Sequence, residues 1–201
     1  METKRESRLG EGYLSLIADR RKALADAVTG ALDDDAQFVW EIGSGHGHFL
    51  TAYAAQHRDA VCVGIDIIGE RVERSLRKRN RAGLQDLHFF HAEAGLFLET
   101  LPPRAAIARV FVLFPDPWPK TRHHKHRIIQ PAFLALLRSR MRHDAELFFR
   151  TDHRAYFDYA KLTLSNQPGW RLADSPWPFE FESVFQQRAS AHYSLCACPC
   201  H

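Results

Sequence analysis

The chain has 201 residues, of which 45% are hydrophobic and 25% charged, and its formal net charge is +3. These values are ordinary for a globular protein, and the length suits one domain with a sizeable core. No apolar run approaches the length that crosses a membrane, so no membrane partner is expected.

The first 32 residues are predicted to form a basic lead-in followed by a helix, because apolar side chains recur there at mostly helical spacing. The first six residues contain no apolar stretch of the kind found in signal peptides. We therefore expect a cytoplasmic protein.

Apolar runs alternate with helical patterns through the middle of the chain. The expected strands are 38–42, 60–67, 87–91, 109–114 and 146–151. The expected helices are 47–56, 70–81, 95–101, 132–142 and 154–166. Strands that are apolar throughout and alternate with helices are typical of a parallel sheet covered on both faces. The sequence predicts a single α/β domain over residues 1–201, with a doubly wound, mostly parallel, Rossmann-like sheet.

Residues 168–201 have a different pattern, rich in proline and aromatic side chains. We expect this extension to add a strand or two and a loop over the carboxyl edge of the sheet, where doubly wound sheets bind their ligands.

A glycine loop follows the first expected strand, with Gly43, Gly45 and Gly47 at alternate positions and Glu41 just before them. Glycines at this spacing allow a tight turn with the backbone open to a ligand. The G-x-G-x-x-G spacing of dinucleotide-binding proteins fails here because position 48 is histidine, which disfavours a dehydrogenase. The loop resembles the first motif of class I S-adenosylmethionine-dependent methyltransferases.

Two further acids follow the next strands. Asp66 lies about twenty residues past the glycine loop, which is the spacing of an acid that binds ribose hydroxyls; its alternative role is a helix N-cap. Glu93 follows the third strand, where class I methyltransferases place a polar or acidic residue near the adenine. It equally suits the start of the next helix, whose dipole it would favour.

The stretch from Phe114 to Arg127 joins a carboxylate to a cationic loop. Pro115 and Pro117 restrict the backbone around Asp116, and the loop that follows carries no acid. A rigid carboxylate beside a loop that binds polyanions indicates chemistry on nucleic acid.

Basic residues also gather at 71–81 and at Arg138, Arg140 and Arg142, and the three groups together favour a surface that binds phosphate. No metal site is expected. The histidines of residues 123–126 lie among cations that would repel a divalent ion, and Cys196, Cys198 and Cys200 lack the usual ligand spacing at a chain end where fraying is common.

These motifs together resemble the bacterial tRNA (guanine-N7)-methyltransferases over residues 38 to 160. The most specific match is the run from Phe114 to Arg127, which is similar to that family's F-P-D-P-W-x-K-x-R-H-x-K-R-R motif. The resemblance implies the class I methyltransferase fold, S-adenosylmethionine as cofactor and tRNA as partner.

The resemblance also implies residue roles. Cofactor binding is assigned to Glu41, Gly43, Gly45, Gly47, Asp66, Glu93 and Asp116, and Asp116 is the catalytic residue between cofactor and guanine. Contacts with the substrate nucleotide are assigned to Lys120, Asp152, Ser183 and Gln186. Contacts with the tRNA backbone are assigned to Arg122, His123, His124, Lys125, His126 and Arg127.

The sequence departs from the family in its carboxyl-terminal motif, T-x-F-E, for which the nearest match runs from Ser183 to Gln186. Glutamine lacks the negative charge that faces guanine's donors. Two alternatives stay open: methyl transfer to another RNA base or an exocyclic amine, and a tRNA-binding protein with weak or no catalysis. The oligomeric state stays open between a monomer and a homodimer.

Overall fold

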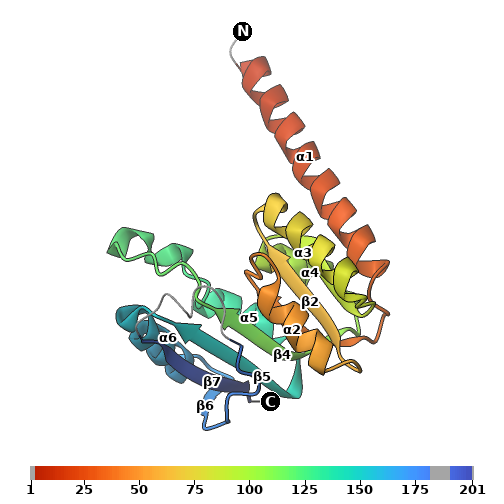
Figure 1. The fold of residues 1–201 in the computed structure, drawn as a ribbon. Helices are drawn as coiled ribbons and strands as arrows, with labels where there is room; N and C mark the ends of the chain where they lie inside the picture. Colours follow the sequence, from red (N-terminus) through yellow and green to blue (C-terminus); the bar gives the residue numbers. More distant parts are fainter. Residues whose placement is uncertain (1–2, 182–190, 201) are drawn as a thin grey trace.

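The computed structural model describes residues 3–181 and 191–200, with side chains from residue 15 onward. In this part of the chain, seven strands form one sheet in the order β3-β2-β1-β4-β5-β7-β6 (Figure 1). The strands are β1 (Gln37–Ile42), β2 (Val61–Asp66), β3 (Leu87–His91), β4 (Ala106–Leu113), β5 (Met141–Thr151), β6 (Trp170–Ala173) and β7 (Tyr193–Pro199). The first five are parallel, and β7 runs antiparallel between β5 and β6, so the prediction of a mostly parallel sheet is confirmed.

Helices cover both faces of the sheet. They are α1 (Thr3–Thr29), α2 (His48–Gln56), α3 (Gly69–Ala82), α4 (Ala94–Thr100), α5 (Pro131–Arg138) and α6 (Arg154–Asn166), with a short 3-10 helix, η1 (Thr121–His126). One apolar core lies beneath α1, α4, α5 and α6. The other lies beneath α2, α3 and residues 173–181. No described helix is long and apolar enough to cross a membrane.

The first strand serves both cores because successive side chains of a strand point to opposite faces. Phe38 and Trp40 are buried in the first core, and Val39 is buried in the second. The strand ends at Ile42, and Glu41 points to the face that α2 covers, beneath the glycine loop. The carboxyl end of β1 therefore delivers both the loop and its acid to one place.

Helix α1 begins at Thr3, so the residues expected to form a lead-in are helical. Leu24, Val28 and Leu32 anchor the end of this segment in the first core. The amino-terminal part of α1 extends away from the body of the molecule (Figure 1).

The boundary between α5 and β5 was predicted wrongly. The helix ends at Arg138, and β5 begins at Met141 rather than at residue 146. The physical reason is that Met141 pairs with Ile107 of β4 and is buried, which extends the strand. Arg140 meanwhile accepts a backbone hydrogen bond from Ile107 through its carbonyl.

The basic group at residues 138–142 lies at the amino edge of the sheet, where its arginines bind their own chain. Arg138 donates to the carbonyl of Cys200 at 3.1 Å, and Arg140 donates to the carbonyl of Pro102 at 3.3 Å. Arg142 forms an ion pair with Asp144. They lie at the opposite edge from the glycine loop and do not extend a phosphate-binding surface there.

The cysteine-containing tail forms the inner strand β7 and is not frayed. Ala197 pairs with Leu147 of β5 on one side and with Leu172 of β6 on the other. Cys196 and Cys198 are buried in this strand, and Cys200 is partly exposed just after it.

We expect Cys200 to react with a thiol reagent at pH 8 far faster than Cys62 or Cys196. Burial raises the pKa of Cys62 and of Cys196 to about 12, so both stay protonated, and burial also blocks access. Mass spectrometry of the protein after brief alkylation measures this, with a urea-unfolded sample as the control in which all four cysteines react. Equal labelling of Cys196 and Cys200 in the folded protein would mean that β7 does not form.

Candidate functional site

A pocket of about 340 Å³ lies at the carboxyl edge of the sheet, and we call it the carboxyl-edge pocket. Five of the predicted site residues line it: Gly43 after β1, Asp66 at the end of β2, Glu93 after β3, Asp116 after β4 and His126 of η1. Parallel pairing explains this, because it places the carboxyl ends of these strands side by side.

The glycine loop adopts a backbone that only glycine takes easily, since Gly43, Gly45 and Gly47 have φ angles of 74°, 55° and 67°. A Cβ on Gly47 would meet Ser75 and Phe89 at 2.8 Å, so this glycine is required for packing. Around Gly43 and Gly45 a Cβ would meet nothing within 4 Å, and this leaves room for a ligand beside the loop.

Asp66 is fixed by backbone amides and is only 3% exposed. Its carboxylate accepts from the N–H of Gly45 at 2.9 Å and from the N–H of Ile68 at 2.8 Å. The guanidinium of Arg71 lies 3.6 Å away. A carboxylate has about four acceptor positions, so it can still accept from a ligand's hydroxyl groups in the pocket.

Glu41 does not line the pocket but is buried beneath the glycine loop, and one of its carboxyl oxygens has no hydrogen-bond partner within the described part of the chain. Burial raises its pKa well above the ordinary value; the amide of Leu50 opposes this, and the negative charge of Asp66 adds to it. A buried carboxyl with a raised pKa is favoured in its neutral, protonated form.

Glu93 takes the structural role that was left open for it, since its side chain caps α4 by accepting from the amides of Gly95 and Leu96. It also lines the carboxyl-edge pocket. The sequence did not single out Ile67 and Ile68, which are 70% and 41% exposed in the same pocket. Exposed apolar side chains directly after the strand that ends in Asp66 are the signal that could have identified them.

The turn that carries Asp116 is strained on both sides. Phe114 and Trp118 have φ angles of 49° and 46°, which are unfavourable for bulky side chains. The N–H of Phe114 donates to the carbonyl of Arg150 at 2.7 Å, and this ties the turn to β5. Asp116 itself is exposed, and both aromatic side chains line the pocket beside it.

Arg127 is expected to contact the RNA backbone, but it is only 4% exposed and is not available for that contact in this conformation. Its Nε donates to the carbonyl of Pro117 at 2.9 Å. Its guanidinium lies over the rings of Tyr156 and Tyr159, at 4.7 and 4.8 Å from their centres. Arg127 therefore fastens the Asp116 turn to α6.

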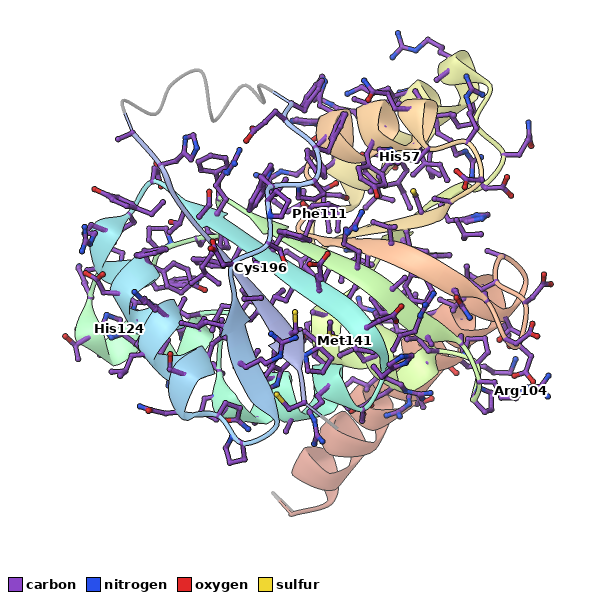
Figure 2. All side chains as sticks on the ribbon, turned by 90° about the horizontal axis from the view of Figure 1, so that it is seen from below. His57, Arg104, Phe111, His124, Met141 and Cys196 are labelled. Atoms are coloured by element: carbon purple, nitrogen blue, oxygen red, sulfur yellow. The ribbon has the colours of Figure 1, made fainter. Side chains whose placement is uncertain are left out.

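The other cations of this stretch stand on η1. Arg122, Lys125 and His126 are exposed, and His123 and His124 are partly exposed. Gln130 holds η1 by donating to the carbonyl of His124 at 2.6 Å. Figure 2 shows His124 at one end of the molecule. The helix therefore presents basic side chains next to the Asp116 turn.

Two of the predicted substrate-binding residues lie on the surface of the protein. Lys120 and Asp152 are exposed, Lys120 just before η1 and Asp152 just after β5, and neither lines the carboxyl-edge pocket. Ser183 and Gln186 lie outside the described residues.

Within residues 15–181 and 191–200, one group could supply three metal ligands: Glu146, Cys196 and Cys198. The Sγ of Cys196 lies 3.9 Å from one Glu146 oxygen, while the guanidinium of Arg109 lies 3.5 Å from the other. Arg109 already pairs with the carboxylate, and burial keeps the thiols protonated, so packing explains this group.

Replacing Glu41 with Gln is expected to raise the melting temperature more at pH 8 than at pH 5. A carboxyl whose pKa is raised by folding contributes stability below its unfolded pKa and loses it as the pH rises toward the folded value, whereas Gln stays neutral. Thermal unfolding at the two pH values measures the difference. Asp35→Asn is the control at an exposed acid, and an equal response of both variants would contradict a buried, protonated Glu41.

Replacing Arg127 with Ala is expected to lower the free energy of unfolding by about 1–3 kcal/mol, since a buried hydrogen bond and two ring contacts are lost. Arg122→Ala, on the exposed side of η1, should change it by roughly 0.5 kcal/mol or less. Urea unfolding measures both, and equal effects would show that Arg127 does not fasten the turn.

Known methyltransferases are similar to most of this sequence. The methyltransferase family model Methyltransf_4 matches residues 35–181. A tRNA (guanine-N(7)-)-methyltransferase of Acidithiobacillus ferrooxidans is 34% identical over 166 residues, which cover 78% of this chain and 73% of that protein. The enzyme of the same name from Chromohalobacter salexigens is 33% identical over 141 residues, covering 70% of this chain and 57% of the relative. The match to the enzyme of the same name from Thermus thermophilus covers 46% of that relative. The chain therefore spans about half the length of some of the relatives it matches.

Solved structures share the fold. The 16S rRNA methyltransferase KamB has a TM-score of 0.60 at 18% identity, with 88% of this chain and 92% of that chain covered. An antibiotic-related methyltransferase has a TM-score of 0.59 at 21% identity, with 87% and 92% covered. From the matched length and the identity to its relatives, the chain belongs to the tRNA (guanine-N(7)-)-methyltransferase family and has the Rossmann-like fold of class I methyltransferases.

Proposed function

We propose that this chain transfers a methyl group from S-adenosylmethionine to N7 of a guanine in tRNA. The observation that carries the proposal is the convergence of the glycine loop, Asp66 and the strained Asp116 turn on one pocket, with exposed cations on η1 beside it. The names of the relatives supply the target atom and the RNA class.

The carboxyl-edge pocket has the donors and acceptors that this cofactor needs. Asp66 would accept from the ribose hydroxyls, and Ile67 and Ile68 would cover the adenine. Gly43 and Gly45 leave space for the amino-acid part, whose ammonium group would favour ionisation of the Glu41 carboxyl buried beneath the loop. When bound, S-adenosylmethionine supplies an activated methyl group on a positively charged sulfur.

The chain's contribution to the reaction is alignment and electrostatics. Guanine N7 carries an available lone pair, so no side chain has to remove a proton before the new N–C bond forms. Methylation leaves a positive charge on the base, and the carboxylate of Asp116 is placed to stabilise it. The positive φ angles around Asp116 fix its direction in advance, which lowers the cost of orientation in the transition state.

Recognition of the base requires acceptors, because guanine presents N1–H and N2–H₂ as donors on its Watson–Crick edge. Asp152 is exposed at the end of β5, where its carboxylate can accept from both. Lys120 and the cations of η1 suit the phosphates on either side of the target nucleotide. Ser183 and Gln186 would complete the pocket. Bringing the base into such a pocket costs a few kcal/mol of unstacking.

Incubation with labelled S-adenosylmethionine and unmodified tRNA, followed by nucleoside analysis, is expected to yield 7-methylguanosine. Asp116→Ala should lower turnover about 100-fold or more while tRNA affinity stays within a few-fold, because the residue acts on the transition state. Asp59→Asn, at an exposed acid before β2, is the matched control.

Three outcomes would contradict the proposal. Methylation of an exocyclic amine would make the chain an amino methyltransferase, and a different methylated base would change the target. Binding of cofactor and tRNA without turnover on any tRNA would make it a binding protein.

A further inference from the structure

A second basic surface lies on the outer side of the glycine loop. It is a cleft of about 280 Å³, lined by His46 of the loop, by His48 at the start of α2, and by Arg74, Arg77, Lys78 and Arg81 of α3. We call it the basic cleft. Residues 74, 77, 78 and 81 follow helical spacing, so the four side chains form one stripe that faces the loop. No acid lines the cleft.

The charges of the basic cleft are held close together. Lys78 donates to the carbonyl of His46 at 2.8 Å, which joins α3 to the loop. Burial, and then the charge of Arg81, lower the pKa of Lys78 to about 8. Burial also lowers the pKa of His48, with added repulsion from Lys78 and His46. A bound anion would reduce the repulsion between these closely spaced cations and favour their charged forms.

The carboxylates of α3 only partly offset this charge. Glu70 lies 2.5 Å from Arg74, and Glu73 lies 3.9 Å from Arg77, each as an exposed pair within the helix. Exposed pairs of this kind are weak and exchange readily for a stronger anion. In addition, the Nδ1 of His46 is buried without a hydrogen-bond partner in the described part of the chain.

The position of the basic cleft relates it to the site. Helix α3 follows β2 and η1 follows β4, and β1 lies between these two strands. The basic cleft adjoins the glycine loop, whose Gly43 lines the carboxyl-edge pocket, and His126 of η1 lines the same pocket, so each basic surface borders it. Apart from the imidazoles of His46 and His48, the basic cleft is lined by arginine and lysine side chains, and guanidinium groups match phosphate oxygens.

We infer that the basic cleft binds the phosphodiester backbone of the RNA substrate at a second point, away from the target nucleotide. The inference rests on the proposed function and extends it, since two contacts on either side of the pocket fix the orientation of the RNA. Contacts of this kind carry no base preference and are sensitive to salt.

The test compares two double variants that remove the same charge. Arg77→Ala/Arg81→Ala changes the basic cleft, and Arg58→Ala/Arg104→Ala is the control. Arg104 pairs with Asp34 and lies at the opposite end of the molecule from His124 (Figure 2). Fluorescence anisotropy with labelled, unmodified tRNA between 50 and 200 mM salt gives the affinity and its salt dependence.

For the cleft variant we expect a Kd about 10-fold higher. The slope of log affinity against log salt concentration should be smaller in magnitude by about one to two. The control should stay within about two-fold. A third variant, Arg77→Lys/Arg81→Lys, keeps the charge and should keep most of the affinity, which separates lost charge from damaged folding. All variants should bind S-adenosylmethionine equally in calorimetry.

Equal tRNA affinity of the cleft variant and the control would overturn the inference while leaving the proposed function intact, provided that the unaltered protein makes 7-methylguanosine. Saturable binding of inorganic phosphate at His46 and His48, followed by NMR, with no effect of the variants on tRNA would also overturn it, because the basic cleft would then serve a small anion. Failure of the unaltered protein to bind tRNA would overturn both the inference and the proposed function.

Discussion

Parallel pairing of β1 with β2 on one side and with β4 on the other is the constraint on which the site depends. It places the ends of these strands along one edge, so residues separated by twenty or more positions become neighbours in one pocket. The antiparallel strand β7 extends the sheet on the far side of β5. The set of residues that line the pocket thus follows from strand order rather than from local sequence.

Asp66 and Asp116 are held in opposite ways, and this difference suits the different roles proposed for them. Asp66 is buried and fixed by two backbone amides, as suits an acid that must present the same acceptors each time a ligand binds. Asp116 is exposed on a turn whose two flanking aromatic residues have positive φ angles. That strain persists because Arg127 and the carbonyl of Arg150 hold the turn from outside. Residues that do not line the pocket therefore help to hold the turn that carries Asp116.

The sequence predicted the sheet and much of the pocket because the relevant signals are local. Apolar strands alternating with helices give the parallel sheet, and the spacing from the glycine loop gives Asp66. The α5–β5 boundary was missed since Met141 is drawn into the strand by Ile107, a partner far away in the chain. Arg127 was misread for the same reason: its charge suggested RNA, whereas Tyr156 and Tyr159, which bury it, come from α6. The roles of Ser183 and Gln186 stay predictions.

The net charge is only +3, but the arginines are unevenly distributed over the protein. At the amino edge, Arg138 and Arg140 bind backbone carbonyls and contribute to stability. At the carboxyl edge, the cations of η1 are exposed, and those of the basic cleft face each other with weak compensation. A polyanion that approaches the protein therefore meets two positive surfaces on either side of one acidic pocket. Under the proposed function, this arrangement would draw the backbone of the RNA to the rim and leave the pocket itself to the cationic cofactor and to the base that becomes cationic.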